Sequence, residues 1–185
     1  DLKIARKLSL LLILPMATFL FLVAVECIER WKDIDELKFV ERAMLVSFSA
    51  GELIHEVQKE RGYTAGYVGS KGKKFSVELP EQQKKSDAAY KQFAAIIADA
   101  NRYENNAFSP IFSSASAKFA ELADVRAAAR DTRIDALQAI AAYGNCINEF
   151  ITAISGLNEQ SHKALTSILQ LMHGKEIAGQ ERATL

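Results

Sequence analysis

The sequence has few of the residues that build disulfide frameworks, metal centres or nucleic-acid surfaces. Its 185 residues include only 2 cysteines, 3 histidines and 3 prolines. Cys27 and Cys146 lie far apart and show no zinc spacing, so we expect no intramolecular disulfide, while a Cys27 bridge between two copies stays open. Lys plus Arg and Asp plus Glu number 23 each, so no net field attracts nucleic acid. Any ion that the protein binds must therefore be captured locally.

Catalytic signatures are also missing. The sequence contains neither a phosphate-binding loop nor a nucleophile elbow. His55 begins a stretch like the zinc motif H-E-x-x-H, but Lys59 stands where the second histidine must be. Glu56 and Glu60 lie one helical turn apart, and we interpret them as a solvated helix face. We therefore expect no enzyme, no metal site and no cofactor.

One long apolar run stands out near the start of the chain. The eighteen residues 8–25, LSLLLILPMATFLFLVAV, carry no charge. As a helix they would span roughly 27 Å, close to the hydrocarbon thickness of a bilayer. A cleaved signal peptide is the alternative, but the run is long for one and no clear A-x-A site follows it. We predict a membrane-spanning helix.

The charges that flank this run predict its orientation. Lys3, Arg6 and Lys7 precede it, and the positive-inside rule places such residues in the cytoplasm. In a bacterium the rest of the chain would then face the periplasm from the inner membrane. The predicted organisation is a cytoplasmic tail over 1–7, a transmembrane helix over 8–30 and a periplasmic domain over 31–185.

Helical periodicity fills the remainder, with no strand signal of any length. We predict an all-α protein in which the membrane helix runs directly into the next helix. The predicted helices cover about residues 31–68, 80–101, 111–130, 135–155 and 159 to the end. A Gly- and Lys-rich loop at 69–76 follows the first of these, and Gly156 is expected to separate the last two.

The stretch HEVQKERGYTAGYVG, residues 55–69, places a charge on an apolar stripe. Arg61 shares this stripe with Ile54, Val57 and Val68, so we expect its guanidinium to be partly buried. A buried guanidinium needs a partner, because an unpaired buried charge costs several kcal/mol. The adjacent Glu60 faces Arg61 poorly, because neighbouring helical residues point about 100° apart. Either a ligand or a carboxylate from another helix must neutralise Arg61.

A second stripe ends in the same way near the end of the sequence. The apolar rhythm of Leu165, Ile168 and Met172 continues through Lys175 and Gly179 to Arg182. Arg182 is therefore a second candidate for binding an anion, with Lys175 one turn earlier on the same stripe.

Small residues accompany both arginines. Gly62, Gly66 and Gly69 lie on one helix face, and each costs about 1 kcal/mol of helix propensity relative to alanine. Close approach of another helix would account for them, and Gly179 offers similar space beside the second arginine. Thr64, one turn after Arg61, could add a hydroxyl donor to a small ligand.

These segments resemble the two signatures of the NIT domain, the nitrate- and nitrite-sensing module of bacterial receptors. ELIHEVQKERGYTAGYVGSKG, residues 52–72, resembles the first, and KEIAGQERATL, residues 175–185, resembles the second. The resemblance extends over about residues 45–185. It implies an all-helical domain of four-helix bundles that share long helices, of which this chain holds the first half.

The resemblance also implies that Arg61 and Arg182 bind nitrate or nitrite. Nitrate is planar with three acceptor oxygens, and a guanidinium is a planar fork that can reach two of them. Tyr63 and Thr64 depart from the aliphatic residue and serine more usual in the pattern, so the choice between the two anions stays open.

Two functional hypotheses follow. In the first, the chain is the periplasmic input of a transmembrane signalling receptor that senses nitrate or nitrite, works as a homodimer and binds no nucleic acid. In the second, it is a membrane-anchored helical bundle for dimerisation or partner contact, and acids of neighbouring helices hold both arginines. Guanidinium groups of Arg61 and Arg182 that converge on an empty cavity would favour the first hypothesis, and a carboxylate already between them would favour the second.

Overall fold

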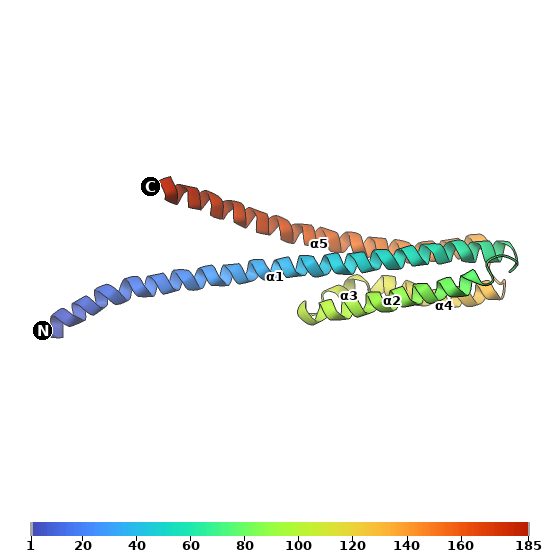
Figure 1. The fold of residues 1–185 in the computed structure, drawn as a ribbon, viewed down its shortest axis with the longest axis horizontal. Coiled ribbons are helices and arrows are strands. Elements are labelled where there is room, and N and C mark those ends of the chain that lie inside the picture. Colours follow the sequence, from blue (N-terminus) through green and yellow to red (C-terminus); the bar gives the residue numbers. More distant parts are fainter. Residues whose placement is uncertain (1, 185) are drawn as a thin grey trace. The chain divides into compact units, whose positions relative to one another are not determined.

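The computed structural model is a chain of helices (Figure 1). It describes the backbone of residues 2–184 and the side chains of residues 13, 15–28, 31, 34–163 and 166. The helices are α1 (Leu2–Gly69), α2 (Glu78–Tyr103), α3 (Phe108–Ile111), α4 (Ser113–Arg130) and α5 (Ala136–Thr184). No strand occurs in residues 2–184, so the all-α prediction is confirmed.

The predicted helix boundaries are close to the observed ones, with one clear error. The first helix is continuous from Leu2 to Gly69, and the loop after it is present as predicted. The expected separation at Gly156 is wrong, because α5 runs through it without interruption. A glycine inside a helix costs only about 1 kcal/mol. Ala153 and the fully buried Leu157 pack into the core on either side of Gly156 and hold the helix there.

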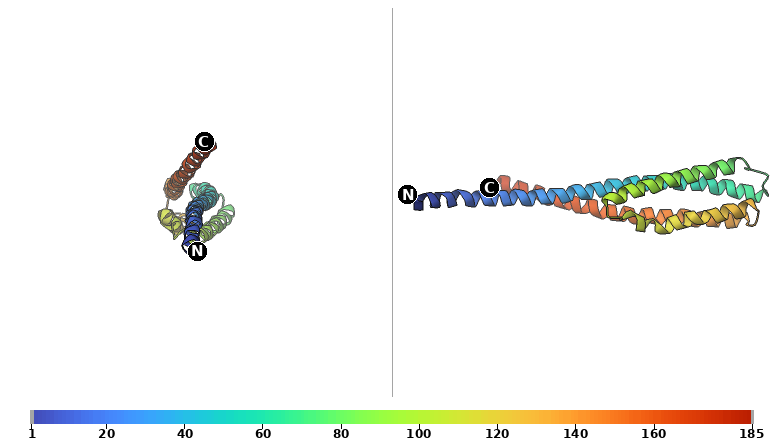
Figure 2. Two further views of the ribbon diagram at one scale, coloured as in Figure 1. Left: turned by 90° about the vertical axis from the view of Figure 1, so that its left-hand side faces the viewer. Right: turned by 90° about the horizontal axis from the view of Figure 1, so that it is seen from below.

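The chain divides into two compact units, residues 39–163 and residues 1–38 together with 164–185. In the larger unit the second part of α1, α2, α4 and the first part of α5 lie alongside one another (Figures 1 and 2). The loop between α1 and α2 and the loop between α4 and α5 lie at the same end of this unit (Figure 2). The candidate site described below lies within it.

The smaller unit contains the predicted membrane span. Among the residues whose side chains are described, no helix is long and apolar enough to cross a membrane. Residues 8–12, 14, 29 and 30 of the predicted span lie outside this part of the structure. The transmembrane helix and the three-part organisation of the chain stay predictions.

Aromatic side chains from three helices fill the centre of the larger unit. Phe93 of α2 meets Phe112 and Phe150 edge to face, with ring centroids 5.1 and 5.4 Å apart. Tyr90 stacks on Phe119 of α4 at 4.2 Å. Such pairs add about 0.5–1.5 kcal/mol each to the free energy gained by burial. They fix α2 and α4 against each other and so position the polar groups one or two turns away.

The core-facing stripe of α1 shares Val57 and Val68 with the predicted one, but contains Leu53 and Glu60 in place of Ile54 and Arg61. Its members lie at three- and four-residue steps, the spacing of a helix packed in a bundle. They are Val46, Ala50, Leu53, Val57, Glu60, Thr64 and Val68, all buried. The residue at the charged position of this stripe is thus Glu60, and Arg61 lies at its edge.

Candidate functional site

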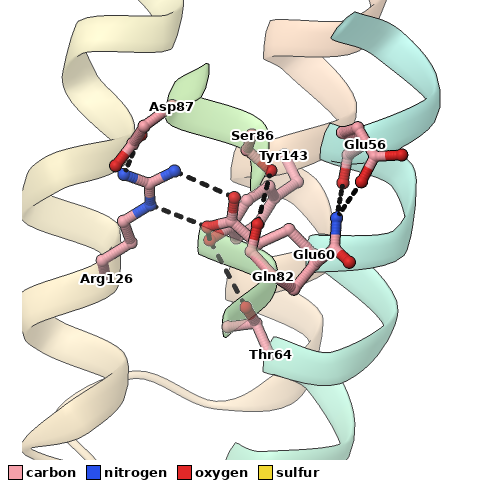
Figure 3. A network of polar contacts seen from close by, with 8 residues as sticks. All are labelled: Glu56, Glu60, Thr64, Gln82, Ser86, Asp87, Arg126 and Tyr143. Carbon is pink, nitrogen blue, oxygen red and sulfur yellow. Dashed lines mark hydrogen bonds and ion pairs between the residues drawn. The ribbon is translucent and has the colours of Figure 1, made fainter. Parts of the chain in front are cut away.

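A fully buried carboxylate lies inside the larger unit, and a network of polar contacts surrounds it (Figure 3). Glu60 of α1 has no exposed surface. Arg126 of α4 binds it with two nitrogens, Nε to Oε1 at 2.7 Å and Nη2 to Oε2 at 2.9 Å. The Tyr143 hydroxyl of α5 donates a third hydrogen bond to Oε1 at 2.6 Å. The buried Glu60 carboxylate therefore has a cationic partner and three hydrogen bonds, which offset the cost of removing its charge from water.

Two further contacts extend this network to neighbouring helices. The remaining Arg126 nitrogen, Nη1, donates to Asp87 of α2 at 2.7 Å. On the other side, Thr64 Oγ1 donates to the Tyr143 hydroxyl at 3.3 Å. We call Glu60, Thr64, Asp87, Arg126 and Tyr143 the Glu60 network, and it joins α1, α2, α4 and α5.

A smaller contact between α1 and α2 lies beside the network (Figure 3). The side-chain amide of Gln82 donates to the Glu56 carboxylate at 2.6 Å and to the Glu56 backbone carbonyl at 3.1 Å. The hydrogen bond from Lys59 lowers the pKa of Glu56. Burial opposes this shift, and the Gln82 hydrogen bond adds to it. This acid is therefore ionised and held against α2.

Burial and charge perturb the other titratable groups around Glu60. Burial disfavours the charged form of Arg126, but its hydrogen bonds and ion pairs with Glu60 and Asp87 outweigh burial and raise its pKa. Burial and the negative charge of Glu60 both raise the pKa of Tyr143. Burial likewise raises the pKa of the Cys146 thiol, to about 12, with Glu60 adding to the effect. The tyrosine and the thiol therefore stay neutral at physiological pH.

The interpretation of Glu56 and Glu60 as a solvated helix face is wrong. Glu60 is fully buried, and only 19% of the Glu56 side chain is exposed. The sequence does contain a signal for this: Glu60 continues the stripe of Leu53 and Val57 at a three-residue step. No sequence signal identified Arg126, because which residue of α4 faces Glu60 depends on the register between the helices.

Arg61 is half-buried at the edge of this stripe. Among the described residues its guanidinium has no hydrogen bond and no ion pair, and no acid lies three or four positions away on α1. The nearest acid in sequence, Glu60, is already bound by Arg126 and Tyr143. Arg61 is thus a partly desolvated cation without a carboxylate among the described residues.

Thr64 is fully buried, and its hydroxyl donates to Tyr143. In this structure it therefore supports Glu60, and direct contact with an anion stays a prediction. Lys175, Gly179 and Arg182, the predicted members of the site on the second signature, lie outside the residues whose side chains the structure describes.

The glycines beside Arg61 differ in their surroundings. A Cβ at Gly66 would lie 2.5 Å from Cε2 and 2.7 Å from Cδ2 of Phe75, whose ring also packs edge to face against Tyr63. Gly66 therefore accommodates an aromatic side chain of the α1–α2 loop. At Gly62 and Gly69 a Cβ would meet no described atom within 4 Å. Close packing at Gly62 stays a prediction.

Within the described part of the chain, no three His, Cys, Asp or Glu side chains gather as ligands for a metal ion. Glu60, Arg126 and Tyr143 of the Glu60 network bind one another and leave the neighbouring Arg61 without a carboxylate partner among the described residues.

Comparison with known proteins identifies the family. No curated protein and no solved structure matches this chain. The model of the NIT family, described as nitrate and nitrite sensing, matches residues 52–185, which include Arg61, the Glu60 network and the second predicted signature. This match covers well over half of the sequence, so the chain belongs to the NIT family of nitrate- and nitrite-sensing domains.

Proposed function

We propose that this chain is the periplasmic input of a membrane-anchored bacterial signalling receptor, and that Arg61 binds nitrate or nitrite. The role of Arg182 stays a prediction from the sequence, because its side chain lies outside the described residues. Membership of a sensing family supports a sensor over an enzyme. The observation that carries the site is the half-buried Arg61, which has no carboxylate partner among the described residues although its helix neighbour Glu60 has three hydrogen bonds.

The chemistry of the two partners supports this ligand. A planar guanidinium offers two parallel N–H groups to two oxygens of a planar anion, and partial burial strengthens the attraction by lowering the local dielectric. Lys175 of the second signature likewise stays a predicted anion ligand, because its side chain lies outside the described residues. Thr64 and Tyr143 would act indirectly, by holding the Glu60 carboxylate away from Arg61.

The rival hypothesis, a bundle without a small ligand, needs an acid of a neighbouring helix on Arg61 and on Arg182. No described acid binds Arg61, whereas Arg126 in the same unit is held by Glu60 and Asp87. The Arg182 side chain lies outside the described residues. An anion-sensing role therefore agrees better with the charges of the larger unit.

The placement in the membrane rests on the sequence. The uncharged run over 8–25 and the three basic residues before it support an inner-membrane anchor with the sensor outside. In this proposal two anchored copies pair as a homodimer, and occupancy of the site is relayed along α1 and α5, the helices that carry the two signatures.

Isothermal titration of the full-length protein with nitrate, nitrite and chloride tests the site. Arg61→Lys keeps the charge but loses the fork, so affinity for the preferred anion should fall by about tenfold or more, which corresponds to about 1.4 kcal/mol. Arg133→Lys is the matched control, because Arg133 is an exposed arginine on the loop before α5. Equal affinity in the wild type and Arg61→Lys would remove Arg61 from the site.

A further inference from the structure

A groove runs between α1 and α2 on the surface of the larger unit. It consists of two adjoining hollows that share Gln92, of about 550 and 330 Å³. The larger hollow lies between Phe48 and Glu52 on α1 and Lys85 and Ala88 on α2. The groove is open to solvent and is distinct from the Glu60 network inside the unit.

The α1 wall of this groove carries large apolar side chains that nothing in the described structure covers. Leu45 is 57% exposed and Phe48 72%. The α2 side of the groove projects less into the solvent, because small side chains such as Ala88 line it. A ridge beside a shallow hollow is the surface against which another helix packs, since its side chains can enter the hollow while the ridge enters its own groove.

The charged residues of the groove indicate that the helix packing against it belongs to a second copy of this chain. Glu52 on α1 and Lys85 on α2 line the same hollow from opposite walls. Neither side chain forms an ion pair or hydrogen bond with the described residues. A two-fold axis parallel to the helices would bring the Glu52 side chain of each copy to Lys85 of the other. The same ion pair then forms twice, once on each side of the axis, as expected for a symmetric dimer interface.

We infer that a second copy of this chain docks on the α1–α2 groove. Phe48 of each copy enters the hollow of the other copy, and Glu52 pairs with Lys85 across the interface. This inference assigns a surface to the homodimer of the proposed function, and it stands independently of the anion site because it uses no residue of that site.

Cross-linking of the full-length protein in membranes tests the pairing. Two differently tagged copies, both Cys27→Ser, carry Glu52→Cys in one and Lys85→Cys in the other, and a short bismaleimide links nearby thiols. We expect a linked species that contains both tags. In the control, Glu121→Cys on the exposed face of α4 replaces Lys85→Cys, and this species should be lost. No link between the two tags, or an equal yield in the control, would overturn the inference.

Self-association of the detergent-solubilised protein, measured by sedimentation, gives a second test. Phe48→Ser should weaken it by about thirtyfold or more, as expected for an aromatic anchor at an interface. Leu137→Ser is the matched control, since Leu137 of α5 is 76% exposed, and it should change nothing. Because Phe48 is exposed in the single chain, its replacement should leave the helical circular dichroism intact.

The charge pair can be exchanged in the same assay. Glu52→Lys and Lys85→Glu should each weaken association, and the double variant should restore it. If the variants associate like wild type, the groove is not the dimer surface and is covered by another part of the protein or by nothing. Nitrate titration of these variants separates the two proposals: normal binding with failed association tests refutes the groove alone.

Discussion

The ion pair between Arg126 and Glu60 provides the sharpest test of how this domain is held together. Arg126→Met keeps most of the side-chain volume but removes two hydrogen bonds and the counter-charge from a fully buried carboxylate. An unpaired buried charge costs about 3–5 kcal/mol. The Tyr143 hydroxyl still donates to Glu60, so we expect a loss near the lower end, about 3 kcal/mol in the free energy of unfolding.

Urea unfolding of the full-length protein, followed by circular dichroism, measures this loss. Arg133→Met is the matched control: its ion pair with Asp131 is 64% and 60% exposed, and such pairs contribute about 0–1 kcal/mol. Adding Glu60→Leu to Arg126→Met should recover most of the stability, because the orphaned charge is then gone. If Arg126→Met costs no more than the control, or the double variant is less stable than the single one, the reasoning fails.

Three smaller predictions concern the residues around this network. Gly66→Ala should be less stable than Gly62→Ala by about 1 kcal/mol or more in thermal melts. The new Cβ at position 66 would clash with the Phe75 ring, whereas a Cβ at position 62 meets no described atom within 4 Å. The Cys146 thiol, with a pKa raised to about 12, should resist maleimide in the folded protein and react once denatured. Glu56 has a lowered pKa, so its contribution to stability is present above the unfolded pKa of about 4.3 and is lost as pH falls through the folded value. Unfolding of Glu56→Gln between about pH 3 and 6 should therefore show a shallower loss of stability in acid than wild type; an unchanged slope would contradict the hydrogen-bonding account.

The sequence by itself determined the helical class, most helix boundaries and the family. Helical periodicity depends on local spacing, and the loop after Gly69 depends on local turn residues, so both can be read along the chain. The continuous α5 was missed because the cost of Gly156 is local and visible in the sequence, whereas the packing of Ala153 and Leu157 that outweighs it is not. The first signature likewise identified Arg61 as a candidate for anion binding from its position among apolar residues.

Only the tertiary structure decided which of two neighbouring charged residues is buried with partners and which has no partner among the described residues. Glu60 and Arg61 are adjacent in sequence, and a shift of one residue at this point in the core stripe of α1 exchanges their roles. That choice depends on Arg126, 66 residues away, and on Tyr143, 83 residues away, which meet Glu60 only when four helices pack in one register. A buried carboxylate is tolerable where such partners converge, and their convergence is a property of the packed bundle.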